Sequence, residues 1–136
     1  MVDTGIYVLI IRLKQNHKIS IGALGEIEFE SGFYLYIGSA QNGLKHRINR
    51  HLSDDKKKHW HIDHLLEFGD IIDVKVKDGG SDEECILAEK IGRFTEEIQN
   101  FGSSDCGCDS HLFYHSDNMA NLKKKLKTLH LQDYRQ

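Results

Sequence analysis

The sequence contains no proline, although average usage would place roughly seven in a chain of 136 residues. This absence excludes proline-rich linkers and is typical of a chain whose connections are short. Long apolar runs are also absent, since none approaches the roughly 18 residues of a membrane-spanning helix. The first residues lack the basic segment and cleavage site of a signal peptide. The length predicts one domain over residues 1–136, with no membrane contact.

Cysteine is scarce, with three residues at positions 85, 106 and 108. An odd number is atypical of a secreted disulfide framework, so we expect a cytoplasmic, reducing location. Cys85 is predicted to be a small buried residue of a helix.

Positive charge is slightly outnumbered overall but concentrated in one segment. The 18 Lys and Arg stand against 21 Asp and Glu, a net charge of −3, which argues against a nucleic-acid-binding protein. Residues 42–61, however, contain six Lys or Arg against two Asp, a balance of +4 that leaves −7 elsewhere. Such a concentration is expected of a protein that binds phosphate backbones. A solvated helix face is the alternative, and charge patterning alone favours it.

The hydrophobic pattern predicts an α+β fold, with a small, mostly antiparallel mixed sheet flanked by helices. Strands are expected at 5–13, 33–37, 70–77 and 111–114, with an extra hairpin formed by 17–22 and 26–30. Helices are expected at 43–52, 59–68, 81–100 and 119–130. The early strands should be antiparallel because tight turns join them.

Three polar or charged side chains are predicted to border the core. Arg47 and His51 lie three and seven residues after Leu44, on the apolar face of one predicted helix. A guanidinium in that position needs an anion, either a carboxylate or a phosphate. Glu84 continues the apolar face of a later helix, where a carboxylate is costly unless it is paired or bound to metal. Ser81-x-x-Glu84 also fits a capping box, and the spacing alone favours capping.

Potential zinc ligands gather in two segments, at 59–64 and at 105–111. They are His59, His61, Asp63, His64, Asp105, Cys106, Cys108 and His111. Thiolate and imidazole ligands suit Zn²⁺, but the C-x-C spacing departs from the usual C-x₂₋₄-C. Two alternatives to a zinc site stay open. These residues could instead be histidines that support the active site, or parts of a polar loop packed over it.

Two tripeptides, Gly5-Ile6-Tyr7 and Tyr36-Ile37-Gly38, resemble the paired signature of the GIY-YIG endonuclease superfamily. Residues 44–48 resemble the helix that carries the superfamily's catalytic arginine, and residues 84–88 resemble the helix with its metal-binding glutamate. The tripeptides are usually much closer together than here. The extra length resembles a hairpin inserted over about 14–32 in a small microbial subfamily of unknown function, which also has a C-terminal extension, here about 101–136.

The resemblance implies metal-dependent hydrolysis of nucleic-acid phosphodiesters, in DNA repair or processing. Glu84 would hold one Mg²⁺ or Mn²⁺, and Arg47 would clamp a phosphate oxygen. Tyr7 would be the general base, Tyr36 would orient water or phosphate, and His51 would be an auxiliary base. DNA is the expected partner, with RNA as an alternative. The implied nucleic-acid contacts are Gly38, Lys45, Arg50, Lys56, Lys57 and Lys58.

Two other functions stay open at this point. One is a nucleic-acid-binding module without activity, and the other is a zinc-stabilised interaction module built on the Cys and His residues. Tyrosines in strands are ordinarily packing residues with a wet hydroxyl, so Tyr7 and Tyr36 alone decide nothing. The joint presence of both tyrosines with Arg47 and Glu84 favours the endonuclease.

Overall fold

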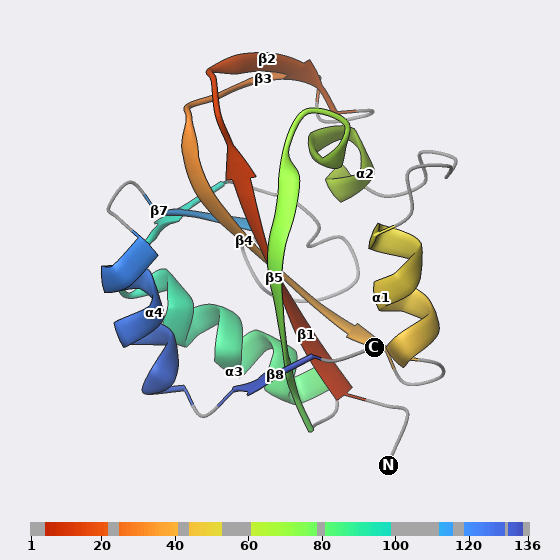
Figure 1. Cartoon of the computed structure of the whole chain (residues 1–136), viewed down its shortest axis with the longest axis vertical. Coiled ribbons are helices and arrows are strands. Elements are labelled where there is room, and N and C mark those ends of the chain that lie inside the picture. The colour runs from red at the N-terminus through yellow and green to blue at the C-terminus, as the bar shows by residue number, and fades with distance from the viewer. Residues whose placement is uncertain are drawn as a thin grey trace.

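The computed structural model describes most of the chain. The described residues are 5–21, 25–40, 44–52, 61–78, 81–98, 112–115, 119–129 and 131–134. The elements, shown in Figure 1, are β1 (Gly5–Leu13), β2 (His17–Ser20), β3 (Glu26–Phe29), β4 (Gly32–Ala40), α1 (Leu44–Leu52), α2 (His61–Leu66), β5 (Asp70–Lys77), α3 (Ser81–Gly92), β6 (Glu96–Glu97), β7 (Leu112–His115), α4 (Met119–Lys127) and β8 (Gln132–Asp133).

Within the described residues, six strands form one antiparallel sheet in the order β6-β7-β4-β1-β5-β8. Strands β2 and β3 pair separately as a hairpin. The predicted α+β class, with an antiparallel sheet and an extra hairpin, is therefore confirmed. The central strand β1 lies between β4 and β5, and its register with β4 places Tyr7 opposite Gly38.

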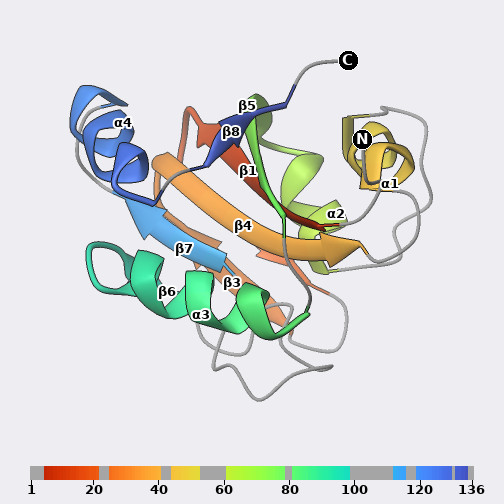
Figure 2. The same cartoon turned by 90° about the horizontal axis from the view of Figure 1, so that it is seen from below.

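Helices cover both faces of the sheet (Figure 2). Successive side chains of β1 point to opposite faces of the sheet, and both faces are covered. This explains why its sequence is almost entirely apolar. Ile6, Val8 and Ile10 pack with buried residues of α3 and α4. Tyr7 and Leu9 belong to a second cluster, which contains buried residues of α1, α2 and the hairpin. No helix in the described part of the chain is long and apolar enough to cross a membrane.

The structure corrects the predicted end of the third helix. Helix α3 ends at Gly92 instead of near residue 100, and β6 follows it. Its last turn tightens, since the amide of Phe94 donates to the carbonyl of Ile91 at 3.2 Å and the Thr95 hydroxyl donates to the same oxygen at 2.7 Å. These bonds satisfy a carbonyl that the ending helix leaves open.

The fourth strand and the C-terminal region also differ from prediction. Strand β4 does not stop before Gly38 but continues to Ala40, because its register with β1 runs to Gly5. A two-residue strand, β8, follows α4 and pairs with β5. The pattern of residues 131–134 was too short to predict it.

Candidate active site

The open end of the β1–β4 pair brings two tyrosines to a histidine of α1. The Tyr7 hydroxyl and Nε2 of His51 form a hydrogen bond of 3.0 Å. The ring centroids of Tyr36 and His51 lie 6.2 Å apart. All three side chains are buried, with exposed fractions of 3%, 8% and 2% for Tyr7, Tyr36 and His51. The fold therefore joins residues that are far apart in the sequence.

Gly38 provides the space that the Tyr7 side chain occupies. A Cβ on Gly38 would lie 2.3 Å from Oη and 2.4 Å from Cζ of Tyr7, far closer than van der Waals contact. Gly38 was predicted to contact nucleic acid, and the structure gives it this packing role beside Tyr7. Its lack of a side chain sets the position of the phenol against His51.

Changing Gly38 to alanine is expected to lower the free energy of unfolding by about 1–3 kcal/mol, the usual cost of overpacking. The buried ring of Tyr7 would have to move and weaken its bond to His51. Urea denaturation measures the loss. In a Tyr7→Ala background the same Gly38→Ala change should cost much less, and an equal cost in both backgrounds would contradict the packing role.

A second set of contacts connects α1 to α3 through one residue of β4. Nη1 of Arg47 donates to the Ser39 carbonyl at 2.7 Å, and the Ser39 hydroxyl donates to Oε2 of Glu84 at 2.7 Å. Successive strand residues point to opposite faces, so Gly38 faces Tyr7 while Ser39 faces α3. Glu84, only 8% exposed, is thus linked to Arg47 through Ser39 although its helix covers the other face of the sheet.

Sequence reasoning missed Ser39. The available signal was its position directly after Gly38, on the face of β4 that also carries the buried residues Leu35 and Ile37. The capping-box alternative for Glu84 depends on the side chain of Ser81, which lies outside the described side chains.

Burial controls the protonation of both tyrosines. It raises the pKa of Tyr7 above the ordinary value of about 10, while the charge of Arg47 and a hydrogen bond from it act in the opposite direction. Burial also raises the pKa of Tyr36, and the neighbouring Tyr7 and Glu84 add to this rise. Both phenols are therefore protonated at neutral pH and are not bases by themselves.

Arg50, a predicted nucleic-acid contact, is engaged inside the protein. Its two terminal nitrogens donate to the two carboxylate oxygens of Asp63 at 3.1 and 3.0 Å. The Asp63 side chain is fully buried, whereas that of Arg50 is 24% exposed. This bidentate ion pair joins α1 to α2, and it assigns Asp63 a structural partner that the zinc hypothesis did not anticipate.

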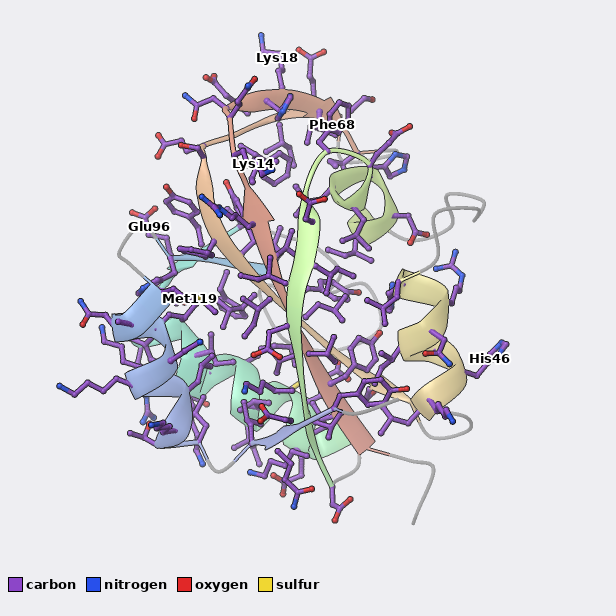
Figure 3. The ribbon with its side chains drawn as sticks, viewed as in Figure 1. Lys14, Lys18, His46, Phe68, Glu96 and Met119 are labelled. Carbon is purple, nitrogen blue, oxygen red and sulfur yellow. The ribbon has the colours of Figure 1, made fainter. Side chains whose placement is uncertain are left out.

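The structure places some of the remaining predicted residues and does not describe the others. Lys45 is exposed on α1, and Figure 3 shows His46 pointing away from the sheet. Cys85 is half-buried and disulfide-bonded, so its prediction as a simple small buried residue is wrong. Several predicted residues lie outside the described residues or, for His61, outside the described side chains: Lys56, Lys57, Lys58, His59, His61, Asp105, Cys106, Cys108 and His111.

Glu84 was predicted to hold Mg²⁺ or Mn²⁺, and it lies among the described residues. Among the described residues, no group of three or more His, Cys, Asp or Glu could hold a metal ion. Mg²⁺ nevertheless binds through one or two carboxylates and keeps several waters. Among the residues that the structure describes, Glu84 could therefore hold Mg²⁺ or Mn²⁺ together with water and a substrate phosphate, and no set of protein ligands there would enclose an ion.

The fold and contacts define an α+β protein with a buried Tyr–His pair beside an Arg–Ser–Glu chain. Within that class, the chain belongs to the family described as domain of unknown function DUF123, whose model matches residues 6–133. No curated protein and no solved structure gives a significant match.

This membership overturns the resemblance drawn from the two tripeptides. DUF123 is a distinct family, and no GIY-YIG family model matches the chain. The assignment to the GIY-YIG superfamily, and to its microbial subfamily, is therefore wrong. Two tripeptides and two short helical segments are too few residues to decide a family, so function has to be argued from the geometry of the site.

Proposed function

We propose that the protein is a nucleic-acid endonuclease that hydrolyses phosphodiester bonds with Mg²⁺ or Mn²⁺. One observation carries the proposal: at one end of the β1–β4 pair, Tyr7 and His51 form a hydrogen bond of 3.0 Å, and Ser39 links Arg47 to Glu84 through two bonds of 2.7 Å. The charge of Arg47 and a hydrogen bond from it also act on the Tyr7 phenol. These residues supply a proton acceptor, a cation for a phosphate oxygen and a carboxylate for a metal ion. Phosphodiester hydrolysis uses these three kinds of group.

Arg47 is suited to a phosphate oxygen. Its bond to the Ser39 carbonyl and its hydrogen bond to the Tyr7 phenol fix the plane of the guanidinium, which has five N–H donors. A planar, permanently charged guanidinium binds phosphate through two parallel hydrogen bonds. Arg47 thereby stabilises the negative charge that develops on the phosphate during attack by water.

Tyr7 and His51 form a proton relay. Because the pKa of Tyr7 is raised, the phenol accepts a proton from the attacking water only as it passes its own to His51. Nε2 of His51 is 3.0 Å from the hydroxyl and receives that proton. The water oxygen bonds to phosphorus as the leaving oxygen departs. Tyr7 thus acts together with His51 instead of as a lone general base, and Tyr36 beside them orients the water or phosphate.

Glu84 would hold the metal ion, which stabilises charge on the phosphate and the leaving oxygen when bound. The Ser39 hydroxyl donates to Oε2 and orients the carboxylate. DNA is the proposed partner, with RNA as the alternative, because the segment from 42 to 61 carries the local charge of +4.

The test is cleavage of nicked, branched and single-stranded DNA with Mg²⁺ or Mn²⁺, and with EDTA as the metal-free arm. Glu84→Gln is expected to reduce the cleavage rate about 100-fold or more, because metal stabilisation contributes several kcal/mol. Glu89→Gln is the matched control, since Glu89 lies on the same helix and is exposed. It should cleave at the wild-type rate.

Each result separates the candidate functions. Equal cleavage by Glu84→Gln and the wild type would contradict the proposed site. A wild-type protein that binds DNA with a steep salt dependence, but cuts none of the substrates, would support the binding module. Stoichiometric zinc that is lost in Cys106→Ser would support the zinc-stabilised module.

A further inference from the structure

A cavity of about 340 Å³ opens beside His51. His51 and Leu52 of α1 line it together with residues 66–71, which connect the end of α2 to the start of β5. Small-molecule sites begin at about 300 Å³, so this cavity has room for one compact ligand. His51 is shared by the cavity and the hydrogen bond to Tyr7.

Phe68 gives the cavity an exposed aromatic ring. Its exposed fraction is 46%, although a phenylalanine ordinarily lies inside. The His17 ring of β2 packs against it at a centroid distance of 4.9 Å, and Figure 3 shows Phe68 beside the β2–β3 hairpin. The ring is therefore supported by the hairpin while part of it faces solvent.

The backbone holds Phe68 in this position. The amides of Phe68 and Gly69 both donate to the Leu65 carbonyl at 3.0 Å, which fixes the turn after α2. A Cβ on Gly69 would lie 2.8 Å from Cγ2 of Ile11, so the chain passes very close to β1 at that point. Because Gly69 lies against the sheet, the turn presents Phe68 at the surface next to the cavity.

Two of the residues that line the cavity, Glu67 and Asp70, carry carboxylates. An ionised carboxylate accepts hydrogen bonds and donates none. An aromatic ring and carboxylate acceptors together suit a flat ring that carries N–H donors. Adenine, cytosine and guanine have an exocyclic amino group with two N–H donors, whereas thymine has carbonyl oxygens and a single ring N–H on its pairing edge.

We propose that this cavity holds a nucleobase that carries an amino group, stacked on Phe68 and donating to Glu67 or Asp70. The inference rests on the proposed function, because His51 belongs both to the cavity and to the proposed Tyr7–His51 proton relay. A base enters such a cavity only when it is unpaired, from a single strand or by flipping out of a duplex. The substrate class is therefore nucleic acid with an unpaired adenine, cytosine or guanine at the cleaved position.

The experiment measures binding of fluorescent oligo(dA), oligo(dC) and oligo(dT) of equal length to the full chain in EDTA. Adenine and cytosine strands should bind about 2- to 10-fold more tightly than thymine strands, as expected for one additional hydrogen bond. Phe68→Ala should weaken oligo(dA) binding about 5- to 100-fold, the usual range for loss of a base–aromatic stack. Phe68→Trp should keep the affinity near the wild type.

Ile72→Ala is the control for loss of exposed apolar surface. Ile72 is 43% exposed on β5, close in sequence to the cavity, and it does not line it. Its replacement should leave oligo(dA) affinity unchanged. The double change Glu67→Gln and Asp70→Asn should remove the preference over oligo(dT), because amides donate as well as accept.

The outcomes separate this inference from the proposed function. Binding that depends on Phe68 in a protein that cleaves nothing would support the cavity and overturn the hydrolysis. Cleavage and binding that are the same in Phe68→Ala and the wild type would overturn the cavity and keep the hydrolysis. Equal affinity for all three strands in the wild type would overturn the assignment of an amino-bearing base.

Discussion

Replacing Arg47 with alanine is expected to slow cleavage by about 100- to 1,000-fold, the usual effect of removing one group that stabilises transition-state charge. The guanidinium lies between the Ser39 carbonyl and the phenol of Tyr7, where it also lowers the phenol's pKa. Its loss therefore removes the phosphate clamp and makes the Tyr7 proton harder to transfer. The helix itself should persist, because its buried contacts come from Ile48 and His51.

Single-turnover cleavage at saturating protein is the appropriate measurement, since it separates the chemical step from binding. Arg47→Lys should recover little, because an ammonium cannot reproduce the two parallel hydrogen bonds of a guanidinium. Lys45→Ala removes an exposed cation from the same helix and should weaken binding slightly without slowing the chemical step. Wild-type cleavage rates in Arg47→Ala, with unchanged circular dichroism, would rule out the proposed clamp.

Replacing Arg50 with methionine is expected to lower the free energy of unfolding by about 3–5 kcal/mol. The Asp63 carboxylate has no exposed surface, and its bidentate bonds to Arg50 compensate for the loss of water. Removing one partner of a buried pair leaves an uncompensated charge, which is strongly destabilising. Urea denaturation with a fixed m-value measures the change.

Two further variants test whether burial causes this effect. Arg93→Ala breaks an exposed pair with Glu89 on α3, whose side chains are 72% and 73% exposed, and should cost less than about 1 kcal/mol. The double change Arg50→Met and Asp63→Leu should recover most of the stability, because neither charge is then buried. A loss in Arg50→Met no larger than in Arg93→Ala would show that the pair contributes little.

The strands were predictable because their patterns are local. Residues 5–13 are apolar on both faces and residues 70–77 alternate, as a central strand and its neighbour require. The end of α3 was not predictable in this way. Phe94 and Ile98 continue the helical spacing of three and four residues that Leu87 and Ile91 begin, but Phe94 packs with the cluster of α3 and α4, and Ile98 with the cluster on the other face. They therefore cannot share one helix face.

The positions of the site residues were predictable only where they depend on a single helix or strand. Helical spacing placed Arg47 and His51 at the border of the core, and the structure finds both in contact with groups of the sheet. Ser39 and the pairing of Arg50 with Asp63 depend on strand register and on the packing of α1 against α2, which the sequence does not specify locally. The cavity beside His51 depends on the same packing.

The edge strands of the sheet affect whether two copies of the chain can pair edge to edge. In the described part of the sheet, both outermost strands, β6 and β8, are two residues long. β6 carries two glutamates, and Asp133 of β8 is tied to Lys75 by an ion pair. Short, charged borders give an incoming strand few backbone groups to pair with. At the high concentrations used for crystallisation or spectroscopy, this sheet should therefore resist edge-to-edge growth into fibres.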